Sequence, residues 1–344
     1  MMLDPAHPVI ESHYLETEEG LFFAVKGLVH PPDLFLACLR YMPDQNGDRC
    51  KNGRRYRRMY HFEEQLQILL NHYPWYLTFE PTIQATLQSV PSRSIQRIFD
   101  PRSYLQQLRQ QTKRDAAQED ALNFANQLQQ ISGIPFESLG ISGSLLIGMH
   151  TDQSDLDMSV YGIQNCIALH RALKSALAQY ETETISRLDP NGMQTLYSER
   201  SVDTHMNYED FFRSEQNKVN QGRYRDRTYF IRFLKEPEET GEKYGDHRYI
   251  PLGRAEITAT LTADQDAIFT PSSYSLTDVQ LLQGSSEYLV QEIVSFRGRF
   301  CDQARVGDLI QASGTVERVI DTSGNTWHRL LLGNSVADTM IVMR

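Results

Sequence analysis

A Gly-Ser pair and an Asp-x-Asp pair lie close together near the middle of this chain. Ten residues separate Ser144, which follows Gly143, from Asp155, and Asp157 comes one apolar residue later. Side chains alternate faces along a strand, so Asp155 and Asp157 would project from the same side. Two such carboxylates can bind a hard divalent cation such as Mg²⁺ through oxygen. A Gly-Ser corner that opens a short helix offers backbone N–H groups and a hydroxyl to an anion. A phosphate site joined to a metal site in this way is what nucleotidyl transfer requires.

This arrangement resembles the signature of the DNA polymerase β-like nucleotidyltransferase superfamily. That signature is an apolar residue, Gly, Gly or Ser, a spacer of roughly nine to thirteen residues, and then Asp-apolar-Asp/Glu-apolar. Every part occurs in this order within residues 138–162, and the resemblance is much weaker elsewhere. It implies an α+β fold with the polymerase β-like nucleotidyltransferase core.

The resemblance also implies roles for the residues of the motif. Asp155 and Asp157 would be catalytic carboxylates that coordinate two Mg²⁺ ions, with an NTP as the substrate. Ser144 and nearby backbone N–H groups would hold the β and γ phosphates, and Gly143 would let the backbone approach closely. Catalysis would depend on positioning and charge stabilisation more than on covalent chemistry.

A third carboxylate is the least certain part of the predicted catalytic site. Active members of the superfamily usually add one from a neighbouring strand. Glu256, which lies between apolar neighbours in an expected strand, is our first choice, and Asp203 is the second. A solvent-facing strand residue is the alternative interpretation of Glu256. The strand expected at 227–235 contains no acid, so an inactive relative of these enzymes stays open.

Two basic segments could guide a polyanion. The first places five cations in eight residues, next to Tyr56 and Tyr60: Lys51, Arg54, Arg55, Arg57 and Arg58. The second leads into the expected strand at 227–235: Lys218, Arg223, Arg225 and Arg227. Cations beside aromatic rings suit phosphate contacts and base stacking, although most charge runs are solvated faces. In an otherwise acidic protein, the first segment favours an RNA or DNA partner.

Hydrophobic patterns divide the chain into three expected regions. Residues 1–101 form a small α+β N-terminal domain with the basic cluster, 102–245 the nucleotidyltransferase core, and 246–344 a β-rich, OB-like domain. A plain β-sandwich is the alternative for the last region. Helices are expected at 61–72, 102–131 and 164–181, and C-terminal strands at 255–262, 267–270, 289–296, 309–319 and 327–332.

Composition limits the possible environment of the protein. The 344 residues are 40% hydrophobic and 23% charged, which is enough for two or three domains with real cores. The four cysteines are widely separated, so we expect neither a disulfide framework nor a zinc site, and a reducing, cytoplasmic location. No signal peptide and no run of about 20 apolar residues is found, so no membrane span is expected. The net charge of −10 does not exclude a nucleic-acid partner, because local patches decide such binding.

Together these features predict a Mg²⁺-dependent nucleotidyltransferase. It would move a nucleoside monophosphate from an NTP to an acceptor hydroxyl, and the acceptor that we favour is a tRNA-like RNA end. One alternative is a small-molecule or protein acceptor. Another is a catalytically inactive RNA-binding module. The preferred NTP, the acceptor and the oligomeric state cannot be derived from the sequence.

Overall fold

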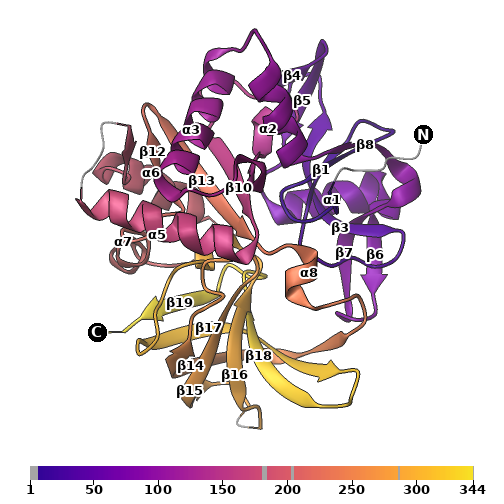
Figure 1. The fold of residues 1–344 in the computed structure, drawn as a ribbon. Coiled ribbons are helices and arrows are strands. Elements are labelled where there is room, and N and C mark those ends of the chain that lie inside the picture. Colours follow the sequence, from indigo (N-terminus) through magenta and orange to yellow (C-terminus); the bar gives the residue numbers. More distant parts are fainter. Residues whose placement is uncertain (1–6, 180–183, 203–204, 286, 344) are drawn as a thin grey trace. The chain divides into compact units, whose positions relative to one another are not determined.

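The computed structural model describes residues 7–179, 184–202, 205–285 and 287–343, and it has the mixed α+β composition expected (Figure 1). The chain forms two compact units. The first unit holds Met1–Glu80, Ala85–Ser186 and Gly222–Tyr244, and the second holds Pro81–Gln84, Arg187–Gln221 and Gly245–Arg344. The N-terminal and core regions that we separated at residue 101 thus belong to one unit. No helix in the described parts of the chain is long and apolar enough to span a bilayer.

The N-terminal part of the first unit is an eight-stranded antiparallel sheet with one long helix, α1 (Phe62–His72). Its strands are β1 (Tyr14–Thr17), β2 (Phe22–Val25), β3 (Leu34–Pro43), β4 (Arg49–Lys51), β5 (Arg54–Arg58), β6 (Leu77–Glu80), β7 (Ala85–Pro91) and β8 (Ile95–Phe99). The order is β4-β5-β3-β2-β1-β8, and β7 joins β3 to β6. Alternation along β2 buries Phe23 with Leu69 of α1 on one face and Phe22 with Tyr41 on the other.

A five-stranded sheet with the order β11-β12-β13-β10-β9 carries the motif. Its strands are β9 (Leu139–Ile141), β10 (Leu156–Tyr161), β11 (Ile185–Ser186), β12 (Gln221–Tyr224) and β13 (Arg227–Leu234), and β10 and β13 run parallel. Helices α3 (Ala116–Ser132) and α5 (Ile163–Gln179) pack together, and Phe124 of α3 contacts the rings of Tyr224 and Tyr229. Leu156 and Met158 are buried, whereas Asp155 and Asp157 project from the opposite face of β10.

The single helix expected at 102–131 is wrong, because the structure contains two helices there. They are α2 (Pro101–Gln110) and α3, and each begins at an aspartate that caps it. Asp100 accepts from the backbone N–H groups of Arg102 and Ser103, and Asp115 forms a capping box with Gln118. The helices expected at 61–72 and 164–181 and the strand at 227–235 are confirmed as α1, α5 and β13.

The second unit combines two helices, α6 (Pro190–Arg200) and α7 (Tyr208–Glu215), with a barrel. The barrel strands are β14 (His247–Ala263), β15 (Ser272–Gln283), β16 (Val290–Ser295), β17 (Leu309–Asp321), β18 (Thr326–Leu332) and β19 (Thr339–Val342). Pairings run β14-β15-β16-β18-β17 and return to β14, so five strands close on themselves, and β19 extends β17. This closure distinguishes a barrel from a plain sandwich.

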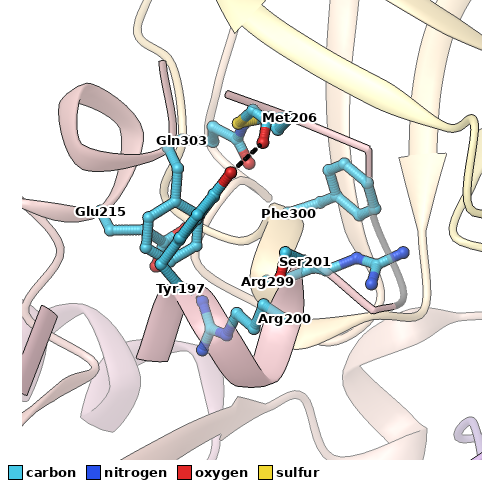
Figure 2. Close-up of a pocket in the computed structure, with 9 residues that line it drawn as sticks. Tyr197, Arg200, Ser201, Met206, Glu215, Arg299, Phe300 and Gln303 are labelled. Atoms are coloured by element: carbon cyan, nitrogen blue, oxygen red, sulfur yellow. Dashed lines mark hydrogen bonds and ion pairs between the residues drawn. The ribbon is translucent and has the colours of Figure 1, made fainter. Parts of the chain in front are cut away.

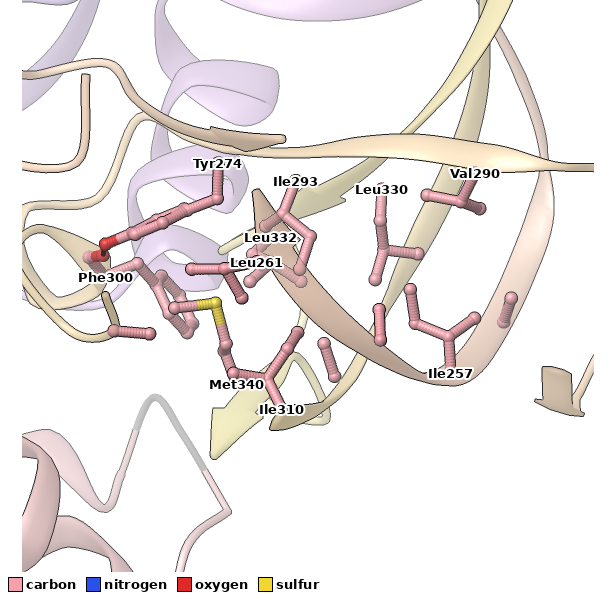
Figure 3. Packing of buried hydrophobic residues seen from close by; sticks show 14 of the residues in the cluster. Ile257, Leu261, Tyr274, Val290, Ile293, Phe300, Ile310, Leu330, Leu332 and Met340 are labelled. Carbon is pink, nitrogen blue, oxygen red and sulfur yellow. Dashed lines mark hydrogen bonds between the residues drawn. The ribbon is translucent and has the colours of Figure 1, made fainter. Parts of the chain in front are cut away.

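Buried side chains from every strand of this closed sheet fill the barrel (Figure 3). Ile257, Ile293 and Leu330 are among them, and the hydroxyl of Tyr274 donates to the carbonyl of Phe300 at 2.6 Å. The strand expected at 267–270 is wrong, because these residues lie in a turn that ends before β15.

Candidate functional site

The Gly-Ser corner and the acidic pair meet at one place in the first unit. The corner opens the short helix α4 (Gly143–Leu146) directly after β9, and the N–H of Ser142 donates to the carbonyl of Asp157 at 2.8 Å. Gly143 has a φ of +61°, and a Cβ on it would lie 1.9 Å from Oδ2 of Asp157. Only glycine allows the backbone to approach this carboxylate so closely.

Both carboxylates lie on the sheet face opposite the helices. Asp155 and Asp157 are partly exposed, and among the described residues no basic nitrogen lies within 4.0 Å of either carboxylate. Burial, and then the negative charge of Asp155, raise the pKa of Asp157 to about 6. The guanidinium groups of Arg58, Arg232 and Arg40 act in the opposite direction. Asp157 is therefore mostly ionised at neutral pH and takes up a proton in mild acid.

Strand β13 brings an arginine, not an acid, next to the pair. Its parallel register sets Phe230 beside Asp157 and Arg232 beside Ser159, so Arg232 shares the face of the carboxylates. Arg232 forms an ion pair of 3.2 Å with Glu11, whose side chain is buried. A neighbouring-strand carboxylate is thus missing at the position where the superfamily resemblance implies one.

Neither predicted source of a third carboxylate is among the described residues of the first unit. Glu256 belongs to β14 of the second unit, is partly exposed, and accepts from Nε2 of Gln311 at 2.5 Å. Asp203 lies outside the described residues. Among the residues that are described, no three His, Cys, Asp or Glu side chains are grouped to hold a metal ion. Asp155 and Asp157 alone fit an ion that takes its other ligands from phosphate and water, as Mg²⁺ commonly does.

The spacer between the two halves of the motif is held by side chains. The Ser144 hydroxyl donates to Oγ of Ser154 at 3.2 Å, and that oxygen accepts from the N–H of Thr151 at 2.9 Å. Arg227 donates to the carbonyls of Asp152 at 2.8 Å and Ser154 at 3.1 Å. The Ser144 hydroxyl therefore helps to hold the spacer in this structure. To contact a phosphate as predicted, it would have to break its hydrogen bond to Ser154 and donate to the phosphate oxygen.

The first basic cluster is divided between three environments. Lys51 donates to the carbonyl of Ile147, just after the Gly-Ser corner, and lies 4.8 Å from the ring centre of Phe99. Arg58 lies within electrostatic reach of Asp155 and Asp157. Arg58 therefore belongs to the surroundings of the acidic pair, and Lys51 holds the loop that follows the Gly-Ser corner.

The other three cations of this cluster are closer to solvent. Arg57 is paired with Asp44 at 3.2 Å and with Glu64 at 2.5 Å, which neutralises its charge. Arg54 and Arg55 are exposed, and neither has a carboxylate within 4.0 Å among the described residues. Arg54 and Arg55 remain the best candidates in this cluster for contact with a polyanion.

The lysine of the second basic cluster is buried inside the second unit. Lys218 is 2% exposed, is paired with Glu215 at 2.7 Å and donates to the carbonyl of Arg299 at 2.5 Å. The prediction that Lys218 contacts nucleic acid is therefore wrong, because a buried and paired ammonium cannot reach a phosphate.

The arginines of this cluster remain at the surface of the first unit. Arg225 and Arg227 share Asp120, at 3.0 and 2.9 Å, and Arg223 donates to the carbonyl of Asp226 at 3.3 Å. Their net contribution to a positive surface is reduced by the shared carboxylate.

Sequence reasoning missed Arg40 and Arg232. Arg40 is an isolated cation in the apolar strand Leu34–Pro43, and Arg232 stands between Ile231 and Phe233. A single charge inside an otherwise apolar strand is a signal that could have identified both, because burying a charge without a partner is costly.

The second unit has a separate small pocket (Figure 2). Tyr197, Phe211 and Phe300 provide aromatic walls, with Arg200 and Gln303 among the polar groups. Arg200 is paired with Glu215 at 2.7 Å, and the Tyr197 hydroxyl donates to the carbonyl of Met206 at 2.9 Å. These interactions stabilise the wall of the cavity and suggest no reaction.

The fold and this site define a two-unit α+β protein with an acidic pair set against a glycine corner. No family model matches the chain, and no solved structure matches it. The chain is 30% identical over 331 residues to "Uncharacterized protein MJ1086" of Methanocaldococcus jannaschii, and the match covers 94% of each protein. The chain therefore belongs to the family of this archaeal protein.

Proposed function

We propose that the protein is a Mg²⁺-dependent nucleotidyltransferase that moves a nucleoside monophosphate from an NTP to an acceptor hydroxyl. The observation that carries this proposal is the contact between Gly143 and the carboxylate of Asp157. The order β9, α4, β10, α5, with β13 parallel to β10, is the order of elements that the superfamily resemblance implies. The proposal therefore has support from both the fold and the site.

The chain's own groups have distinct tasks in this proposal. Asp155 and Asp157 hold the metal, and the metal supplies charge neutralisation and polarises the reacting oxygens. Asp157 must give up its proton first, which its pKa of about 6 allows at neutral pH. Gly143 lets the start of α4 lie directly against the carboxylate of Asp157. Positioning and charge stabilisation then account for most of the rate.

An RNA end is the acceptor that we propose. Arg54 and Arg55 offer exposed cations in the first unit, which suits a phosphate backbone. In the second unit, the closed five-stranded sheet with β16 parallel to β18 supports an OB-like barrel, a fold that often binds oligonucleotides. Both observations concern nucleic-acid binding.

A nucleotide-binding module without catalysis is the second candidate. The observation that favours it is Arg232, which occupies the face of β13 where an active enzyme would be expected to present an acid. Such a protein would bind a nucleotide at the same corner and transfer nothing.

Incorporation of label tests the proposed reaction. The protein is incubated with Mg²⁺, each NTP labelled in its α-phosphate, and total RNA, and the RNA is separated from free nucleotide. We expect labelled RNA with the wild type, almost none with Asp155→Ala or Asp157→Ala, and wild-type labelling with Asp152→Ala, an exposed acid of the same spacer.

The outcomes separate the candidates. Label that persists in Asp155→Ala and Asp157→Ala would refute the proposed site. NTP binding without transfer to RNA or to a small-molecule extract would favour the non-catalytic module. Label on a small molecule or on protein would keep the reaction and change the acceptor.

A further inference from the structure

The N-terminal sheet packs directly against the loop that follows the Gly-Ser corner. Phe22 and Tyr41 of this sheet share a buried cluster with Leu146, Ile147 and Met149. In addition, Arg49 donates to Oγ1 of Thr151 at 3.2 Å, and Lys51 donates to the carbonyl of Ile147. The sheet is therefore part of the wall around the acidic pair.

Two arginines of this sheet lie within electrostatic reach of Asp157. Arg40 lies on β3 and Arg58 ends the neighbouring strand β5, where it is opposite Tyr41 in the antiparallel register. Both guanidinium groups interact electrostatically with Asp157. They come from a part of the chain that the superfamily motif does not include.

Neither arginine has a carboxylate partner. Among the described residues, no carboxylate oxygen lies within 4.0 Å of Arg40 or Arg58. Arg40 donates to the carbonyl of Met59 at 3.5 Å and is hydrogen-bonded to the hydroxyl of Tyr14. Nε of Arg58 is buried without a hydrogen-bond partner. Arg57, the next residue along β5, shows the contrast, because it is paired with two carboxylates. No carboxylate neutralises either guanidinium charge, so Arg40 and Arg58 can both bind an anion.

Charges of both signs are thus present at one site without direct pairs. A simple anion would satisfy the arginines only, and a simple cation would satisfy the carboxylates only. A metal-bound triphosphate satisfies both, because its cation binds carboxylates while its outer oxygens accept from guanidinium groups.

We propose that Arg40 and Arg58 bind the β and γ phosphate oxygens of the nucleotide whose metal is held by Asp155 and Asp157. This inference rests on the proposed function and extends it. The N-terminal sheet becomes a phosphate-binding part of the active site, and it selects triphosphates over monophosphates.

Titration calorimetry on the full chain tests this inference. The probes are MgATP, magnesium tripolyphosphate, MgAMP and adenosine. The variants are Arg40→Gln, Arg58→Gln and Arg58→Lys. The matched control is Arg171→Gln. Arg171 is exposed on α5, which covers the face of the five-stranded sheet opposite the acidic pair. Thermal unfolding without ligand reports whether each variant is folded.

We expect Arg40→Gln and Arg58→Gln to bind MgATP and tripolyphosphate about tenfold or more weakly, while Arg171→Gln binds as the wild type does. Arg58→Lys should recover part of the affinity, because it restores the charge without the planar fork. The wild type should bind MgAMP and adenosine weakly, and the two arginine variants should leave that weak binding unchanged. If Arg58→Gln does not fold, Arg40→Gln and Arg58→Lys decide the question.

Failure of this inference differs from failure of the proposed function. Affinity for MgATP within about twofold of the wild type in both arginine variants overturns the inference. If Asp157→Asn loses MgATP in the same series, the proposed function survives. A wild-type protein that binds neither MgATP nor tripolyphosphate overturns both.

Discussion

Replacing Asp157 by asparagine should stabilise the ligand-free protein at neutral pH. Burial and the charge of Asp155 raise the pKa of Asp157 from 3.8 to about 6. At a pH below the pKa of the unfolded chain, the Asp157 carboxyl is protonated in both the folded and the unfolded state, so it does not change the free energy of unfolding. Between the two values, only the unfolded chain ionises, so stability falls as the pH rises, and the loss is complete above pH 6. Asparagine cannot ionise and avoids this loss.

The size of the effect follows from the shift. About two pKa units correspond to about 3 kcal/mol of unfolding free energy, at 1.36 kcal/mol per unit. Partial exposure of Asp157 screens part of this, so we expect ~1–3 kcal/mol. For a chain of 344 residues, that is a rise in the midpoint of thermal unfolding of roughly 1–4 °C.

Thermal unfolding in a chelating buffer, from about pH 4 to about pH 8, measures this effect. The difference between Asp157→Asn and the wild type should be small at the acidic end and grow to its full value near neutrality. Asp152→Asn, at an exposed position of the same loop, is the control. A variant that is less stable than the wild type at neutral pH, or a difference that does not change with pH, would refute this reasoning.

Three other predictions follow from the same contacts. Gly143→Ala should abolish MgATP binding in calorimetry, because its Cβ would lie 1.9 Å from Oδ2 of Asp157. The control is Gly148→Ala, where φ is +67° but the nearest atom to a Cβ is 3.7 Å away. This control should lose only about 1 kcal/mol of unfolding free energy and should still bind MgATP. Lys218→Ala should lower the free energy of unfolding by about 1.5–3 kcal/mol in a denaturant titration, because the buried carboxylate of Glu215 loses one of its cations and keeps Arg200. MgATP affinity should fall as the pH is lowered through about 6, because Asp157 must be ionised to hold the metal, and calorimetry at several pH values should show the matching proton release.

The sequence predicts the motif well because its parts are close along the chain. A strand, a corner and a second strand within about 20 residues leave few ways to fold, so the approach of Gly143 to Asp157 follows from local geometry. Apolar periodicity similarly predicts α1 and α5. It fails at residues 111–115, because a polar segment continues a helical pattern until the capping aspartate Asp115 shows that a new helix begins.

The arginines around the site could not be predicted in the same way. Arg40 and Arg232 reach Asp157 through the packing of strands that are far apart in sequence, and no local pattern specifies that packing. Lys218 shows the converse error. A run of basic residues predicts an exposed surface, but the ammonium group of Lys218 is buried. Burial is possible because Glu215, three residues earlier, provides a charge partner. Charge runs therefore need a count of acidic neighbours in space before they indicate a polyanion site.

Binding of Mn²⁺, followed by electron paramagnetic resonance with and without a non-hydrolysable ATP analogue, tests the central claim most directly. The claim predicts that the protein binds Mn²⁺ tightly only when the analogue is present, and that Asp155→Asn and Asp157→Asn lose this binding while Asp152→Asn keeps it. Mn²⁺ binding that is the same without the nucleotide, or that survives in Asp155→Asn and Asp157→Asn, would contradict the account.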